Sequence, residues 1–317
     1  MILTETPVVT TSLEAAVRAP SPHNTQPWLF EVGADVIDVV LDEDRVLDVC
    51  DPDRREARLS CGAALLNLEL SLAVAGRSCD VEFLPEKDRP ELLARVRIGP
   101  RHRATAAEGR LAAAIRVRYS NRRPFASTPV PAGVRHAVRR AAGEGGAKLV
   151  LLDEVGLLEA VAGLIRRADH LQTLDERFQA ELRRWTRGGE NRDGVPAYAG
   201  GPRPAGGLLP VRHHGESDRL REFERDPVVA VLTTPTDGPL AQIRAGQAMQ
   251  RTLLTATSLG LSASFYSQPL EIPSARAVLR SLLGESEHPQ AIFRLGYGFP
   301  GSPTPRRPVG EVIRIRR

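Results

Sequence analysis

The chain of 317 residues has few cysteines, few lysines and few aromatic residues, the last at 4%. Its three cysteines, Cys50, Cys61 and Cys79, form neither a CxxC pair nor an even set, which excludes a disulfide scaffold and a zinc finger. No apolar run approaches the roughly eighteen residues of a membrane helix. We therefore expect the three cysteines to be reduced core residues. The first residues, 1–12, lack the pattern of a secretory signal, so we expect a cytoplasmic protein with no membrane partner.

Arginine carries almost all of the basic charge, because only Lys87 and Lys148 among 43 basic residues are lysines. A guanidinium binds phosphate through two hydrogen bonds and stays protonated, but frequent arginine beside frequent alanine, glycine and proline also fits a GC-rich genome. The formal net charge is +4, with 39 acidic residues interspersed. Nucleic-acid-binding domains concentrate basic charge on one face, so nucleic acid is not an expected partner.

Hydrophobic periodicity predicts two long helices, 58–76 and 246–260, each followed later by a strand that ends in glycine, 94–99 and 291–296. Strands and helices are interspersed without strict βαβ alternation, which favours an α+β fold. The other predicted strands are 36–41, 81–84, 148–152 and 228–232, and the other predicted helices are 12–19, 104–116, 132–142, 153–169, 171–187 and 274–283.

The two long helices also suggest an internal duplication. A shift of 184 positions pairs Gly62 with Gly246 and matches four further residues around them. The length fits about two domains of roughly 100–200 residues each. We therefore predict two halves, 1–117 and 118–317, each with a mainly antiparallel sheet flanked by helices. The glycine- and proline-rich segment 187–217 is either a linker or a lid over a binding site.

Familiar enzyme motifs are absent or lack their structural context. The glycines of 296–301 fit GxGxxG, but Pro300 and Pro303 obstruct the helix that a dinucleotide-binding turn requires, which favours a simple turn at the end of a strand. The adjacent pair His213 and His214 has no third metal ligand at a suitable spacing, so we predict no metal site. The chain contains no GxSxG, HExxH or P-loop sequence.

Two polar segments remain. In 20–28, Pro-Ser-Pro-His-Asn-Thr-Gln-Pro-Trp, prolines hold an extended backbone, so Ser21, Asn24 and Gln26 can present hydrogen-bonding groups to a flat heteroaromatic ligand. In 118–125, Arg-Tyr-Ser-Asn-Arg-Arg-Pro-Phe, guanidinium and hydroxyl groups are spaced as a phosphate monoester requires. A solvated basic turn is the alternative for the second segment.

Together, P-S-x-x-N-x-Q-P-W at 20–28 and R-x-S-x-R at 118–122 resemble the flavin-dependent nitroreductase superfamily. In that superfamily's dimers the R-x-S segment comes first, whereas here the order is reversed. The reversal and the apparent duplication resemble the Acg-type branch, in which one chain holds two degenerate nitroreductase halves as an internal pseudo-dimer. The resemblance covers nearly the whole chain and implies a nitroreductase-like fold with one composite FMN site, in a monomer or a homodimer.

The resemblance also implies which residues bind FMN. The 118–122 segment and the C-terminal tail would hold the phosphate, the 20–26 segment would reach ribityl and ring atoms, and the backbone of 260–264 would face flavin N5. No catalytic side chain can be named. The implied cofactor-binding residues are Ser21, His23, Asn24, Gln26, Arg118, Ser120, Arg122, Gly260, Leu261, Ser262, Ala263, Arg306 and Arg307.

The resemblance implies an FMN-dependent oxidoreductase that takes hydride from NAD(P)H and passes electrons to a small-molecule acceptor, such as a nitroaromatic, a quinone or another conjugated compound. One alternative is a non-catalytic protein that stores FMN under a closed lid. Another is a dehydrogenase of a biosynthetic intermediate.

Overall fold

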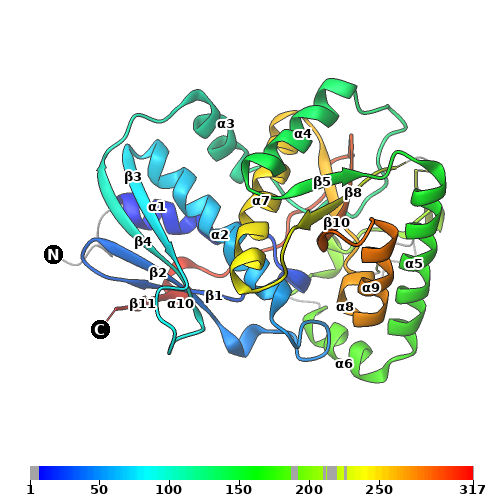
Figure 1. The fold of residues 1–317 in the computed structure, drawn as a ribbon, viewed down its shortest axis with the longest axis horizontal. Coiled ribbons are helices and arrows are strands. Elements are labelled where there is room, and N and C mark those ends of the chain that lie inside the picture. Colours follow the sequence, from blue (N-terminus) through cyan, green and yellow to red (C-terminus); the bar gives the residue numbers. More distant parts are fainter. Residues whose placement is uncertain (1–6, 187–191, 210–211, 213–219, 225–226, 317) are drawn as a thin grey trace.

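The computed structural model describes residues 7–186, 192–209, 212, 220–224 and 227–316. Two sheets lie on either side of two crossed helices, α2 (Arg55–Val74) and α7 (Pro239–Ser258) (Figure 1). One hydrophobic core runs from the first sheet through both helices into the second sheet. The predicted α+β fold with two mainly antiparallel sheets is confirmed.

The first sheet has the strand order β11-β1-β2-β4-β3, antiparallel throughout except that β11 lies parallel to β1. The second sheet has the order β5-β8-β10-β9 and is fully antiparallel. Strands β6 and β7 form a separate parallel pair. The strands are β1 (Trp28–Val32), β2 (Val36–Leu41), β3 (Arg77–Phe83), β4 (Leu92–Arg101), β5 (Lys148–Leu151), β6 (Arg203–Gly206), β7 (Leu220–Glu222), β8 (Val228–Thr234), β9 (Ser262–Phe265), β10 (His288–Gly296) and β11 (Ile313–Ile315).

Further helices cover both sheets. A second hydrophobic cluster packs α5, α8 and α9 on the outer face of β8 and β10 (Figure 1). The remaining helices are α1 (Pro7–Ala16), α3 (Ala106–Ile115), α4 (Ala132–Glu144), α5 (Val155–Leu174), α6 (Glu176–Trp185), α8 (Gln268–Glu271), α9 (Pro273–Leu282) and α10 (Val309–Val312), with short 3-10 turns η2 (Pro22–Asn24), η3 (Glu43–Arg45) and η4 (Ala197–Ala199).

Helices α2 and α7 cross at a pair of glycines. A Cβ atom on Gly62 would lie 2.0 Å from the carbonyl oxygen of Ile243, and one on Gly246 would lie 2.1 Å from that of Leu59. Only glycine allows the two backbones to approach so closely. The two contacts are related by the same shift of 184 residues that pairs the glycines in the sequence. This symmetry supports the duplication, which remains a hypothesis, as do the two predicted halves.

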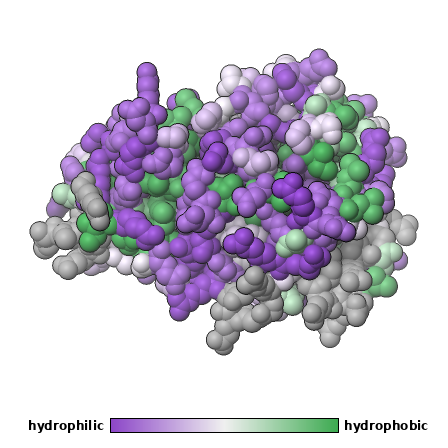
Figure 2. Space-filling model, turned by 90° about the horizontal axis from the view of Figure 1, so that it is seen from below, coloured by the Kyte–Doolittle hydropathy of each residue, from purple (hydrophilic) through white to green (hydrophobic). Residues whose placement is uncertain are grey.

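Contrary to the expectation that no segment is long and apolar enough to cross a membrane, helix α2 is so by length and composition, and 83% of its most apolar window is buried inside the fold. Burial of this kind is what a core helix requires. The face of the molecule shown in Figure 2 is covered mainly by hydrophilic residues, and its apolar residues lie in narrow strips between them.

Two predicted helices begin well away from their predicted start. Helix α1 spans 7–16 rather than 12–19, because Pro7 opens it and Ser12 lies buried inside it. The second long helix begins at Pro239, seven residues before the predicted start at Gly246. Gly246 therefore lies at the crossing of the two helices and not at the end of a helix. The glycines of 296–301 lie in a turn after β10, as predicted.

The C-terminal tail returns from the second sheet to the first, where β11 pairs with β1. On its way it brings Arg306 and Arg307 against the loop after α1. The segment 187–217, predicted as a lid or linker, is described only at 192–209 and 212. The histidine pair His213 and His214 lies outside the described residues.

Candidate functional site

A cavity that is partly open to solvent lies between the loop after α1, the start of α2, β9 and α8. Four predicted site residues line it: Ser21, His23, Ser120 and Arg122. The other lining residues are Pro20, Pro22, Glu56, Leu59, Ser60, Arg212, Met249, Ser264, Phe265, Ser267, Gln268, Leu270, Glu271, Gln290 and Ala291.

The prediction that prolines hold the loop after α1 extended is wrong, because Pro22–Asn24 forms a 3-10 turn. His23, Asn24 and Gln26 all have positive φ angles, of 47°, 59° and 56°. Left-handed conformations are uncommon for residues other than glycine, and they persist only where the surroundings hold them. Here the amide of Gln26 donates to Oγ of Ser21 over 3.0 Å and closes the loop. The loop thus places the rings and amides of this segment in a fixed arrangement beside the cavity.

The two amide side chains of this loop hold other parts of the chain. Asn24 Nδ2 donates to the carbonyls of Gly194 (2.9 Å) and Pro305 (3.0 Å), and its Oδ1 accepts from Arg306 (2.8 Å). Gln26 is fully buried, donates to the carbonyl of Arg192 (2.9 Å), and accepts from an amide of the tail. Neither lines the cavity, and their predicted contact with a cofactor stays a prediction.

Arginine side chains gather next to the cavity without acidic partners. Arg118 donates to the carbonyl of Arg18 over 3.0 Å, and Arg306 donates to the carbonyl of Ala19 over 3.0 Å, both at the C-terminal end of α1. Arg122 donates to the carbonyl of Ala199 over 3.1 Å. Among the described residues, no carboxylate pairs with Arg118, Arg122 or Arg306. We call these three residues the arginine cluster.

The arginine cluster carries positive charge that no carboxylate among the described residues compensates: Arg118 is buried, and Arg122 and Arg306 are half-buried. Burial lowers the pKa of Arg118 and Arg122 to about 10. Burial, together with repulsion from Arg118, Arg18 and Arg122, lowers the pKa of Arg306 to about 9. The buried Nε atoms of Arg118 and Arg306 have no hydrogen-bond partner in the described structure. Such a cluster suits an anion that accepts several hydrogen bonds.

Arg307, the other arginine predicted to bind phosphate, has a different environment. Its guanidinium lies 3.4 Å from the Asp42 carboxylate and donates to the carbonyl of Glu311. Its backbone amide donates to Oε1 of Gln26 over 2.8 Å. The structure brings Arg306 and Arg118 together but gives Arg307 an acidic partner, so Arg307 anchors the tail.

The turn from 260 to 263 lies beside the R-x-S segment. Gly260 adopts a φ of +80° after α7, and Leu261 is buried in the core. The amide of Asn121 donates to the carbonyl of Ala263 over 2.8 Å, and its side chain reaches Oγ of Ser262 over 3.3 Å. None of the four predicted residues of this turn lines the cavity; the next two residues, Ser264 and Phe265, do.

Sequence reasoning missed a buried ion pair at the cavity wall. The Arg212 guanidinium makes two hydrogen bonds with the Glu271 carboxylate, of 2.9 and 2.6 Å. Gln172 donates to the same carboxylate over 2.5 Å and accepts from Arg212 over 2.7 Å. These residues come from α5, α8 and the glycine-rich segment. No motif marks them, since they are brought together only by the fold.

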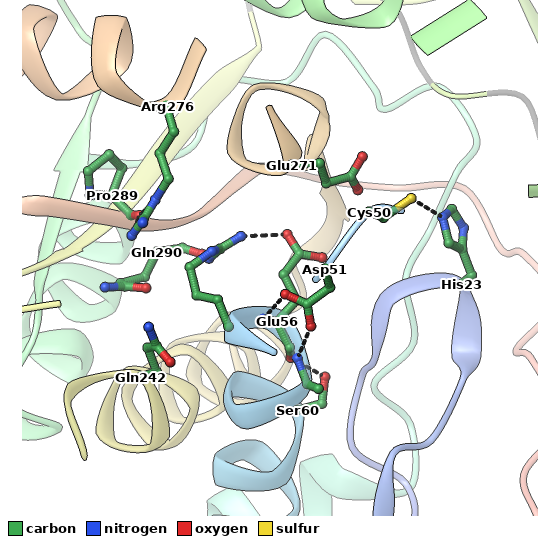
Figure 3. Close-up of polar contacts among 12 residues, drawn as sticks. His23, Cys50, Asp51, Glu56, Ser60, Gln242, Glu271, Arg276, Pro289 and Gln290 are labelled. Atoms are coloured by element: carbon green, nitrogen blue, oxygen red, sulfur yellow. Dashed lines mark hydrogen bonds and ion pairs between the residues drawn. The ribbon is translucent and has the colours of Figure 1, made fainter. Parts of the chain in front are cut away.

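Helix α2 contributes a second acidic group to the cavity. Burial raises the pKa of Glu56 to about 8, although Arg55 donates to its carboxylate over 2.7 Å. The preceding carboxylate, Asp51, accepts hydrogen bonds from the amides of Glu56 (2.9 Å) and Ala57 (2.8 Å) and so caps the helix (Figure 3). The cap fixes the position at which Glu56 enters the cavity wall.

Three side chains of types that can bind metal ions lie close together near this wall. Ligand atoms of His23, Cys50 and Glu271 all lie within 4.8 Å of one another. Figure 3 shows the Glu271 carboxylate pointing toward Cys50 and the His23 ring, whose Nε2 lies 4.0 Å from Cys50 Sγ. Burial, with a smaller contribution from Arg212, lowers the pKa of His23 to about 3, so its imidazole is neutral.

The chain is similar in sequence to known proteins over nearly its whole length. The chain is 35% identical over 96% of its length to a Mycobacterium tuberculosis H37Rv protein described as "Putative NAD(P)H nitroreductase Rv3131", of which 90% is covered. It is 32% identical over 98% of its length to "Putative NAD(P)H nitroreductase acg" of the same strain, of which 96% is covered. This chain belongs to the nitroreductase family.

The sequence model of the nitroreductase family matches residues 203–297, which include β8, α7, β9 and β10. A solved nitroreductase with bound FMN from Desulfitobacterium hafniense is 18% identical, with a TM-score of 0.44, and covers 66% of this chain and 98% of its own. The resemblance to the Acg-type branch of the nitroreductase family is confirmed by the second relative.

Proposed function

We propose that the protein binds FMN and transfers hydride equivalents from NAD(P)H to a nitroaromatic, a quinone or another conjugated acceptor. Membership of the nitroreductase family and the descriptions of its mycobacterial relatives as NAD(P)H nitroreductases support this proposal. The observation that carries it is the arginine cluster beside a cavity lined by both polar and apolar side chains.

The residues present fit the phosphate of FMN. A buried positive charge without a partner is costly, and a phosphate monoester supplies both the negative charge and the acceptor oxygens that would offset it. Arg118 and Arg306 each keep an unused buried Nε–H for such an oxygen. Ser120 lines the cavity next to Arg122 and offers a hydroxyl. These four residues would hold the phosphate end of the cofactor.

FMN supplies the hydride chemistry when it is bound, and the protein binds and orients it. The polar cavity wall contributes Ser21, Ser60 and Gln290 as hydrogen-bonding groups, while Met249 and Phe265 contribute apolar surface. Such a mixture suits a ligand with an apolar ring and polar edges. The fixed loop after α1 keeps Ser21 in place, because its hydroxyl accepts from the amide of Gln26.

Arg118→Ala tests the phosphate assignment. Each hydrogen bond to a charged group contributes about 1.5–3 kcal/mol, so the variant should bind FMN about 10- to 100-fold more weakly. Arg139→Ala is the matched control, because Arg139 is exposed and pairs with Asp153. Flavin absorbance of the purified proteins and fluorescence titration of the flavin-free forms give the affinities. Equal FMN retention by the two folded variants would refute the assignment.

One observation favours storage of FMN as a second candidate function. Arg212, from the segment predicted as a lid, lines the cavity and is held there by Glu271. Anaerobic mixing with NADH and with NADPH distinguishes the two functions. Bleaching of the flavin band supports the oxidoreductase, whereas a flavin reduced by dithionite but not by either nicotinamide supports storage.

A further inference from the structure

A buried cluster of three different metal-ligand types lies at one wall of the cavity. His23 comes from η2, Cys50 from the loop before α2, and Glu271 from the end of α8. The exposed fractions of the three residues are only 5%, 4% and 9%. Imidazole, thiolate and carboxylate are the groups that bind zinc in proteins. We propose that His23, Cys50 and Glu271 form a zinc site with a fourth coordination position open to the cavity.

The distances suit a site that closes slightly around an ion. Zinc binds sulfur at about 2.3 Å and nitrogen or oxygen at about 2.0 Å, so tetrahedral ligand atoms lie about 3.5 Å apart. The separation of His23 Nε2 from Cys50 Sγ is 4.0 Å, and no pair in the cluster exceeds 4.8 Å. Binding therefore requires side-chain shifts of about 1 Å and no rearrangement of the backbone.

The Glu271 carboxylate can bind an ion without losing its present partners. An ionised carboxylate has about four acceptor sites. Three are used, two by Arg212 and one by Gln172, and two of these three bonds end on Oε2. A site on Oε1 remains for the metal. Arg212 and Gln172 would then orient the ligand in the way that hydrogen-bonded neighbours commonly do around metals.

Hydrogen bonds fix the backbone segments that carry the other two ligands, Cys50 and His23. The Glu181 carboxylate accepts from the amides of Val49 (3.1 Å) and Cys50 (3.0 Å) and so fixes the loop that carries the thiol. The η2 turn, closed by the hydrogen bond from the Gln26 amide to Ser21, fixes the backbone that carries His23. Zinc binding would form the Zn–S bond and release the thiol proton of Cys50 to solvent.

His23 and Glu271 line the cavity, and Cys50 does not. The fourth position of the ion would therefore face the space available to a small ligand. Catalytic zinc sites have this plan of three protein ligands and one exchangeable position. An oxygen atom of a small molecule in the cavity could occupy that position. This inference does not depend on the proposed flavin chemistry.

Zinc binding is tested on the purified protein with its natural flavin content. After chelator treatment and dialysis against zinc chloride, we expect about one zinc ion per chain by elemental analysis. Cys50→Ser and His23→Ala should each weaken zinc binding at least tenfold in calorimetric titration. Cys79→Ser is the matched control, because Cys79 lies on β3 and outside the cluster. Equal affinity of Cys50→Ser and Cys79→Ser would overturn the proposal.

X-ray absorption of the zinc-loaded wild-type protein decides the question even where a variant fails to fold. A single sulfur neighbour at about 2.3 Å with nitrogen and oxygen neighbours at about 2.0 Å supports the site. A shell of nitrogen and oxygen alone would show adventitious binding, and no retained zinc would show that the site does not bind zinc; either result would overturn the proposal. Neither measurement uses enzyme activity, so failure of the zinc site and failure of the flavin proposal remain distinguishable.

Discussion

The crossing of α2 and α7 provides a sharp test of the architecture through Gly62→Ala. The new Cβ would lie 2.0 Å from the carbonyl oxygen of Ile243 and 3.1 Å from Cα of Gly246. These are backbone atoms, so no side chain can rotate away, and the helices must separate by about 1 Å or more. Overpacking of a core costs about 1–3 kcal/mol and occasionally more. Alanine's better helix propensity returns at most about 1 kcal/mol. Because the clash is with backbone atoms, the cost should lie at the upper end of this range, which gives a net loss of about 2 kcal/mol.

Urea unfolding followed by circular dichroism measures this loss as a lower midpoint. Gly109→Ala is the matched control, because Gly109 lies in α3 and a Cβ there meets nothing within 4 Å. The control should gain about 0.5–1 kcal/mol. If Gly62→Ala is as stable as Gly109→Ala, the close approach of the two helices is wrong.

A double variant tests whether the two glycines share one contact. A Cβ on Gly246 would lie 2.1 Å from the carbonyl oxygen of Leu59, so Gly246→Ala should also destabilise the protein. Separation of the helices relieves both clashes at once. The double variant should therefore lose clearly less than the sum of the single losses. Additive losses would mean that the two clashes are relieved independently.

Two further changes test buried polar groups. Burial raises the pKa of Glu69 to about 7 although Gln247 donates to it, so the folded state holds the proton more tightly and stability falls as pH rises from about 4.5 to 7. Glu69→Gln should flatten this dependence in urea midpoints; an unchanged slope would contradict it. Gln26→Ala removes bonds to the carbonyl of Arg192 and the amide of Arg307, each contributing about 1 kcal/mol. Hydrogen exchange at the Arg307 amide should accelerate, and unchanged exchange would refute the anchoring role.

Hydrophobic periodicity in the sequence predicts most of the long helices, because each of them buries one face. Strand β2 has the predicted bounds 36–41, and α9 begins one residue before its predicted start. The errors arose where tertiary packing overrides local signals. Glycine usually breaks or ends a helix, yet Gly246 lies inside α7 because only glycine fits the crossing. Strand β11 was missed because its pairing with β1 depends on a tail that returns across the molecule.

The candidate site was predictable where residues adjacent in sequence act together. Ser21 and His23 follow α1, Ser120 and Arg122 form one short motif, and all four line the cavity. The partners Arg212 and Glu271 could not be predicted, since 59 residues separate them and neither lies in a recognisable pattern. Contact between such residues is set by the fold and not by local sequence.

The environment of each arginine, more than its place in a motif, indicates which arginines bind an anion. Arg307 was grouped with Arg306 from the sequence, but Arg307 has Asp42 as a partner and Arg306 has no carboxylate. Leaving a buried charge unpaired costs several kcal/mol, which a fold tolerates only if something offsets it. Arg118 and Arg306 are both arginines without a carboxylate partner among the described residues, and they come from distant parts of the chain. An anion that both contact would tie the tail to the R-x-S segment, so its binding should stabilise the whole fold by linkage.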